Sequence, residues 1–93
     1  MIIAVQTWEL HLPGCHSLKD KRSVLQGIKH SLRRSLNVSV SETDHQDFWQ
    51  RAEIACAAIG TDRRVVEQTL RSADRCVEEA DGVRIIETAV SFL

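Results

Sequence analysis

Aromatic residues are scarce in this 93-residue chain, which contains two Trp, two Phe and no Tyr. Domains that bind RNA on an open β-sheet stack bases on exposed sheet aromatics, so this scarcity argues against that mode of binding. No apolar run approaches the ~20 residues that a membrane helix needs. Proline occurs once and glycine four times, and no stretch has the low complexity of a flexible linker.

Cysteine is also sparse. Cys15, Cys56 and Cys76 are an odd number of thiols, far apart in the sequence, which argues against a disulfide framework and indicates reduced thiols. The first ten residues, MIIAVQTWEL, lack the positive segment and small-residue cleavage site of a signal peptide. We therefore expect a cytoplasmic protein with no membrane association.

The composition is that of a folded globular domain, with 43% hydrophobic and 27% charged residues. Such a balance is atypical of disordered chains, which have too little apolar surface to bury. At this length the chain can bury a real core but has little surplus. We therefore expect a single domain over residues 1–93.

Positive charge is concentrated in one segment, although the net charge is only −1. Residues 18–35 hold six Lys or Arg and one acid, whereas the rest of the chain holds six Lys or Arg and twelve acids. Clustered cations on a rigid element are what contact with a phosphate backbone requires. The candidate nucleic-acid-binding residues are Lys19, Arg22, Lys29, His30, Arg33 and Arg34. Alternatively, these charges belong to a solvated face and pair with Glu42, Asp44 or Glu78.

Hydrophobic periodicity divides the chain into six elements. Alternating or continuous apolar residues predict strands over 2–12, 38–43, 48–59 and 83–92. Helical spacing predicts helices over 17–36, capped by Ser17, and from 61 or 62 to about 80. The apolar stripes of the helices are Leu18, Leu25, Ile28, Leu32 and Leu36, and Val66, Leu70, Ala73, Val77 and Ala80.

The order β-α-β-β-α-β predicts an α+β, ferredoxin-like fold: a four-stranded antiparallel sheet in the order 4-1-3-2 with two helices on one face. Trp8, Leu10 and Ile54 then face the helices, together with Ile86, Val90 and Phe92. The other face of the sheet is left bare and carries Thr7, Glu9, His11, Arg51, Glu53, Ala55, Glu87 and Ala89. Because this face mixes small residues with opposite charges, we expect a homodimer.

The segment from His45 to Arg51 is dense in polar and aromatic residues. As a recognition loop it would use Trp49 as an anchor. As a structural turn it would use Phe48 and Trp49 to close the end of the core, which turn chemistry favours. The candidate partner-binding residues are His45, Gln46, Asp47, Trp49 and Arg51.

Catalytic and metal motifs do not stand out, and we expect no cofactor and no enzymatic activity. Neither His11, Cys15 and His16 nor Asp44, His45 and Asp47 have paired metal-ligand spacing. A cysteine phosphatase would place Cys15 and Arg22 around one phosphate cradle, but Arg22 lies one residue too far along and the loop lacks glycines. Cys15 is expected in an exposed loop as the most reactive thiol, with Cys56 facing inward and Cys76 beside the second helical stripe.

Two stretches resemble the YlxP-like family of bacterial proteins: LPGCHSLKDKRSVLQGIKHSLRRSLNVSVSE and DHQDFWQRAEIACA. The resemblance implies a ferredoxin-like fold and the company of translation and ribosome-maturation genes, but no activity. The sequence therefore favours a non-catalytic binding module whose partner is RNA or a ribosomal particle. The alternative is a protein-interaction module that uses the open sheet face and the hairpin loop.

Overall fold

The computed structural model describes all residues from 1 to 93 and contains four strands and two helices. The elements are β1 (Ile2–His11), α1 (Leu18–Ser35), β2 (Ser39–Asp44), β3 (Arg51–Gly60), α2 (Arg63–Glu78) and β4 (Arg84–Phe92). Their order is the predicted one. The largest difference is at β3, which begins at Arg51 and not at Phe48, so that residues 45–50 form a loop.

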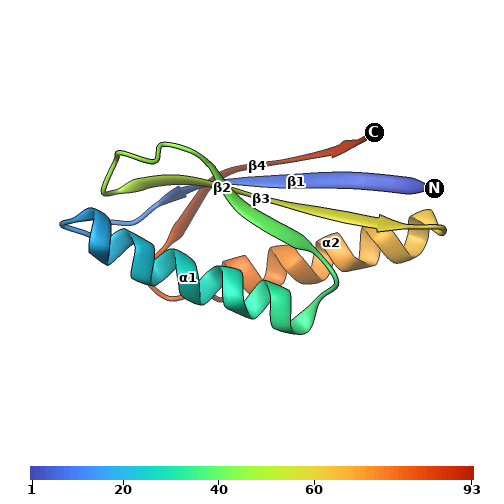
Figure 1. Cartoon of the computed structure of the whole chain (residues 1–93), viewed down its shortest axis with the longest axis horizontal. Helices are drawn as coiled ribbons and strands as arrows, with labels where there is room; N and C mark the ends of the chain where they lie inside the picture. Colours follow the sequence, from blue (N-terminus) through green and yellow to red (C-terminus); the bar gives the residue numbers. More distant parts are fainter.

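The sheet has the strand order β2-β3-β1-β4 with every neighbouring pair antiparallel. Read from the opposite edge this is 4-1-3-2, so the ferredoxin-like α+β fold is confirmed. Both helices lie on the same side of the sheet (Figure 1). The central strand β1 pairs along its full length with β3, from Ile2 opposite Gly60 to His11 opposite Arg51.

The core lies between the helices and one face of the sheet. Alternate residues of β1 and β3 point into it, including Trp8, Leu10 and Ile54, none of which is exposed to solvent. The helical stripes meet them, with Leu25, Ile28 and Leu32 from α1 and Val66, Leu70, Ala73 and Val77 from α2. The predicted facing of both helices is therefore confirmed.

Each helix is preceded by an N-cap residue. The Ser17 hydroxyl accepts a hydrogen bond from the Asp20 amide at 3.0 Å, while the Asp20 carboxylate accepts one from the His16 amide at 3.0 Å. At α2, the Asp62 carboxylate accepts from the Arg64 amide at 2.9 Å. These side chains satisfy amides that have no partner within a helix, which fixes where α1 and α2 start.

A partly buried polar network joins α2 to the sheet. The Trp8 indole N–H donates to Asp74 Oδ1 at 2.9 Å, and Gln6 Nε2 donates to the same oxygen at 3.2 Å and to Thr88 Oγ1 at 3.1 Å. Trp8 fills the middle of the core, so its indole nitrogen needs a partner there. The network therefore links β1, α2 and β4.

The end strand β4 departs from its predicted facing. A register shift between Glu9 and Leu10 of β1 places Ile85 opposite Leu10. Ile85 is therefore half-buried, whereas Ile86 is exposed. Val90 lies opposite the buried Gln6, but half of it is exposed. The inward placement expected of Ile86 is therefore wrong, because a bulge displaces the alternation of a strand by one residue.

The cysteines test the predicted strand facing. Cys56 is buried on β3 as expected, and Cys76 is half-buried beside Val77. The sequence predicts an exposed Cys15, but only 3% of this residue is exposed, so that prediction is wrong. Gln50 Nε2 donates to its carbonyl at 3.1 Å and the Cys15 amide donates to Leu12 O at 3.2 Å. These bonds fold the turn inward, so the expectation that Cys15 is the most reactive thiol loses its basis.

Neither helix combines the length and the apolarity that crossing a bilayer requires.

The core assignment predicts the effect of Leu32→Ala. Leu32 is fully buried, so its truncation should lower the free energy of unfolding by about 2–5 kcal/mol, as measured by urea denaturation. The control is Val65→Ala on the exposed side of α2, which should change it by no more than about 0.5 kcal/mol. Equal urea midpoints for the two variants would contradict the assigned facing of α1.

Candidate functional site

Lys21 is the only charged residue among the buried side chains, with 1% of its surface exposed. Its ammonium group donates to three backbone carbonyls, those of His45 at 2.7 Å, Arg51 at 3.2 Å and Gln46 at 3.3 Å. Glu42 Oε2 lies 2.9 Å from the same nitrogen and has no other polar partner. The three N–H protons of the ammonium group thus have three carbonyl acceptors, while the Glu42 carboxylate balances the positive charge of Lys21.

The sequence of α1 determines where Lys21 points. It lies four residues before Leu25 and seven before Ile28, which places it on the apolar stripe of the helix. Its side chain therefore starts in the core and reaches the end of the sheet. Lys21 is not among the functional residues that the sequence predicts, although a charge within an apolar stripe is a signal that could have identified it.

The loop between β2 and β3 is also held from the opposite face of the sheet. Glu9 Oε1 lies 2.6 Å from His45 Nε2 and 2.7 Å from Arg51 Nη2. The Asp44 carboxylate accepts from the His45 amide at 2.7 Å. His45 has a φ of +62°, a left-handed conformation that costs energy in a non-glycine residue. These contacts stabilise it in that conformation.

The loop presents two aromatic side chains to solvent. Phe48 is 57% exposed and Trp49 is 52% exposed. The His45 ring stacks on Phe48 with centroids 5.5 Å apart. The interpretation that Phe48 and Trp49 close the end of the core is therefore wrong. Leu12 and Cys15 are buried there, and the Leu12 amide donates to Gln50 O at 3.0 Å.

The basic face of α1 is exposed and free of ion pairs. Lys19, Arg22, His30, Arg33 and Arg34 are exposed, and Lys29 is half-buried. None of them lies within 4.0 Å of a carboxylate oxygen, since the five ion pairs of the chain involve other cations. The alternative, pairing with Glu42, Asp44 or Glu78, is absent, and Glu42 pairs instead with the buried Lys21. One internal contact remains, from Arg33 Nη2 to Val40 O at 3.0 Å.

The structure brings the candidate partner-binding loop close to one end of the candidate nucleic-acid-binding helix. The β2–β3 loop lies over the N-terminal end of α1 (Figure 1), where Lys21 joins them. Lys19 and Arg22 flank Lys21 in the sequence, and both lie in the first two turns of α1, the end of the helix over which the loop lies. Arg33 and Arg34 lie in the last turn of the helix, away from the loop.

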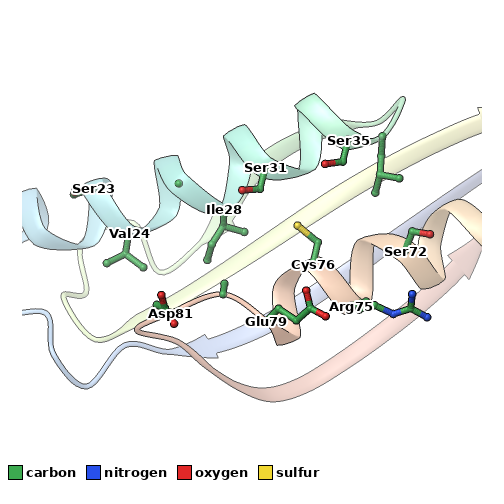
Figure 2. Close-up of a pocket in the computed structure, with 13 residues that line it drawn as sticks. Ser23, Val24, Ile28, Ser31, Ser35, Ser72, Arg75, Cys76, Glu79 and Asp81 are labelled. Atoms are coloured by element: carbon green, nitrogen blue, oxygen red, sulfur yellow. The ribbon is translucent and has the colours of Figure 1, made fainter.

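A groove of about 650 Å³ runs between α1 and α2 (Figure 2). Small residues line it on α1 once per turn, and they are Ser23, Gly27, Ser31 and Ser35. Its other wall includes Cys76 of α2 and Glu79, which directly follows that helix. A Cβ added at Gly27 would meet nothing within 4 Å, so packing within the chain does not require glycine there. No candidate binding residue lies in this groove.

The thiol environments do not suit a nucleophile. Desolvation raises the pKa of the Cys15 thiol, and the nearby charge of Asp20 raises it further, while Lys21 opposes them. Burial raises the pKa of Cys56 to about 11. A cysteine phosphatase needs a thiolate at neutral pH, so the chemistry at Cys15 runs against that interpretation. No group of three His, Cys, Asp or Glu side chains is placed to hold a metal ion.

Residues 3–90 match the model of a protein family described as "Protein of unknown function (DUF503)". The chain belongs to the DUF503 family. A DUF503-like relative is the "Uncharacterized protein YlxP" of Bacillus subtilis (strain 168), which is 42% identical over 55 residues. That match covers 59% of this chain and 60% of the relative. The YlxP-like resemblance of the sequence is therefore confirmed, and the DUF503 description assigns no activity.

Among solved structures, this DUF503 chain is similar to a C-terminal segment of the alpha subunit of aIF2 from Pyrococcus abyssi. The TM-score is 0.46 and the identity 18%, over 100% of this chain and 49% of that chain. A likeness at this level carries no argument about function.

The buried ammonium of this DUF503 protein predicts the effect of Lys21→Met. The substitution keeps the length of the side chain but leaves Glu42 and three carbonyls without their cation. We expect the free energy of unfolding to fall by about 3–5 kcal/mol in urea denaturation. Lys19→Met, two residues away and exposed, should change it by at most about 0.5 kcal/mol. Similar losses in both variants would contradict a structural role for the Lys21 cage.

Proposed function

We propose that the protein is a non-catalytic binding module, one domain over residues 1–93, that contacts RNA or a ribosomal particle through the basic face of α1. The observation that carries the proposal is that the five Lys and Arg residues of this face form no ion pair. Unpaired cations held on one rigid element are available to phosphates without breaking an ion pair.

The spacing of these cations suits an extended polyanion. Arg22, Lys29 and Arg33 are seven and four residues apart, so they lie on one side of α1. Eleven residues of helix span about 16 Å. The contact of Arg33 with Val40 O places this row beside the edge strand β2. A nucleic-acid backbone could therefore run along α1 and touch several cations in turn.

The rest of the surface is acidic, which supports an oriented contact. Twelve of the thirteen acids lie outside residues 18–35. Such a protein is attracted to a polyanion by one side and repelled by the others. Binding is then sensitive to salt, because each phosphate contact releases counterions.

The rival function is that of a protein-interaction module which uses the open sheet face and the β2–β3 loop. Exposed Trp49 and Phe48 favour it, since such residues often anchor protein interfaces. Salt dependence separates the two functions. Phosphate contact weakens steeply with salt, whereas an interface anchored by apolar side chains does not.

We also propose that the open sheet face forms a homodimer in the cytoplasm, where three free thiols suit a reducing compartment. A shallow hollow of about 210 Å³ on the sheet is lined by residues that include Val5, Ala55 and Ala57. Arg51 and Glu53, two of the opposite charges on this face, are already bonded to Glu9 and Thr43 of the same chain. The support therefore comes from the small apolar residues.

The dimer proposal predicts a mass near twice 10.5 kDa in analytical ultracentrifugation at micromolar concentration. Ala57→Glu places a charge in the hollow and should shift the population to monomer. A single monomeric species for the parent protein at every concentration would contradict the dimer.

The RNA proposal predicts a loss of binding in the double variant Arg22→Glu, Lys29→Glu. Neither cation makes an internal bond, so the melting temperature should stay close to that of the parent. Affinity for single-stranded oligouridylate should fall, and the slope of log affinity against log salt should flatten by up to about 0.7 for each lost contact. Co-sedimentation with ribosomal subunits should weaken in parallel.

The matched control is Arg64→Glu, Arg71→Glu, which makes the same change in net charge on exposed positions of α2. It should bind RNA almost as the parent does. If both double variants lose the same affinity, net charge explains the result and the basic face has no special role.

A further inference from the structure

We propose that the β2–β3 loop makes this interface specific for single-stranded RNA: Phe48 and Trp49 stack on unpaired bases whose phosphates contact Lys19 and Arg22. The inference rests on the proposed function and names the form of RNA that the site takes. It assigns the bases to the loop and the backbone to the first two turns of α1.

The aromatic side chains of the loop have the exposure that base stacking needs. Two of the four aromatic residues of the chain are Phe48 and Trp49, each more than half exposed, whereas Trp8 is fully buried and Phe92 is half-buried. Every base has a π-face, so exposed aromatic rings stack on bases of any sequence. Bases within a duplex are already stacked and paired, so such rings select single strands.

Internal hydrogen bonds hold the loop from both faces of the sheet. Lys21 holds the carbonyls of His45, Gln46 and Arg51 from the helix side, while Glu9 holds His45 and Arg51 from the open face. A loop fixed in this way loses little conformational entropy on binding. The buried cation thus fixes the loop backbone while the two aromatic side chains stay in solvent, where they are accessible to a ligand.

The charges around the loop orient the bound RNA strand. Lys19 and Arg22 are exposed and form no ion pair, next to the residue that anchors the loop. Asp44 and Asp47 in the loop segment are exposed as well, and they would repel phosphates at its tip. The backbone is therefore attracted to α1 while the neutral bases reach the aromatic rings. The adjacent unpaired cations favour RNA over a protein partner at this end of the molecule.

Tryptophan fluorescence provides the direct test. Trp8 is fully buried, so quenching by added RNA reports on Trp49. Titration with single-stranded oligouridylate should quench the parent protein, and a duplex RNA of equal length should bind more weakly without quenching. Trp49→Leu should weaken single-strand binding by about 5- to 100-fold. Trp49→Phe should restore most of it when binding is followed by anisotropy of labelled RNA.

The control is Ile59→Ala, an exposed apolar residue at the opposite end of β3, which should bind as the parent does. If Trp49→Leu binds both RNAs as the parent while Arg22→Glu, Lys29→Glu loses them, the stacking inference is overturned and the RNA function stands. If the parent binds neither RNA, both are overturned. In a pull-down at high salt, a protein could be retained by the immobilised parent but not by immobilised Trp49→Leu. That result would assign the loop to a protein partner and overturn the inference.

Discussion

The ammonium group of Lys21 ties together parts of the molecule that are far apart in the sequence. It connects α1 with Glu42 on β2, with the carbonyls of the loop and with the first residue of β3. A buried cation is stable only while its oxygen partners stay in place, because an unpaired charge in the interior costs several kcal/mol. The loop conformation is therefore coupled to the packing of α1, although its aromatic side chains lie in solvent. Glu9 adds a second attachment on the opposite face of the sheet.

Much of the fold could be predicted because its strongest signals are local. The stripes of α1 and α2 repeat at helical spacing and the alternation of β1 and β3 is regular, so the residues that build the core were recognised. The start of β3 and the facing of β4 were not. Both features arise from contacts between segments that are distant in the sequence. One is the bulge opposite Glu9 and Leu10, and the other is the set of hydrogen bonds from Lys21 to the carbonyls of residues 45, 46 and 51. Alternation along one strand contains no information about them.

In the candidate site, too, the sequence predicted which segments matter but not the contacts that their side chains make. The basic face of α1 was visible as an uneven charge distribution, but whether its cations are paired depended on where Glu42 lies. The β2–β3 loop was recognised by composition, yet Phe48 and Trp49 point outward and not into the core. Lys21 escaped notice because its charge was counted with the basic residues, when its place in the apolar stripe was the more informative property. Cys15 follows Pro13-Gly14 and so looks exposed, but Gln50 closes over it.

The hydrogen bond from Arg33 to Val40 O bears on how copies of the chain can associate. β2 is an edge strand, and an edge strand with unsatisfied backbone groups is a template for pairing with another chain. A guanidinium anchored on β2 occupies one backbone acceptor there and brings a positive charge to the rim of the sheet. Two copies that approached edge to edge at β2 would bring two such charges together. Growth of a continuous sheet across this rim is therefore opposed, and the sheet is protected from open-ended polymerisation on that side.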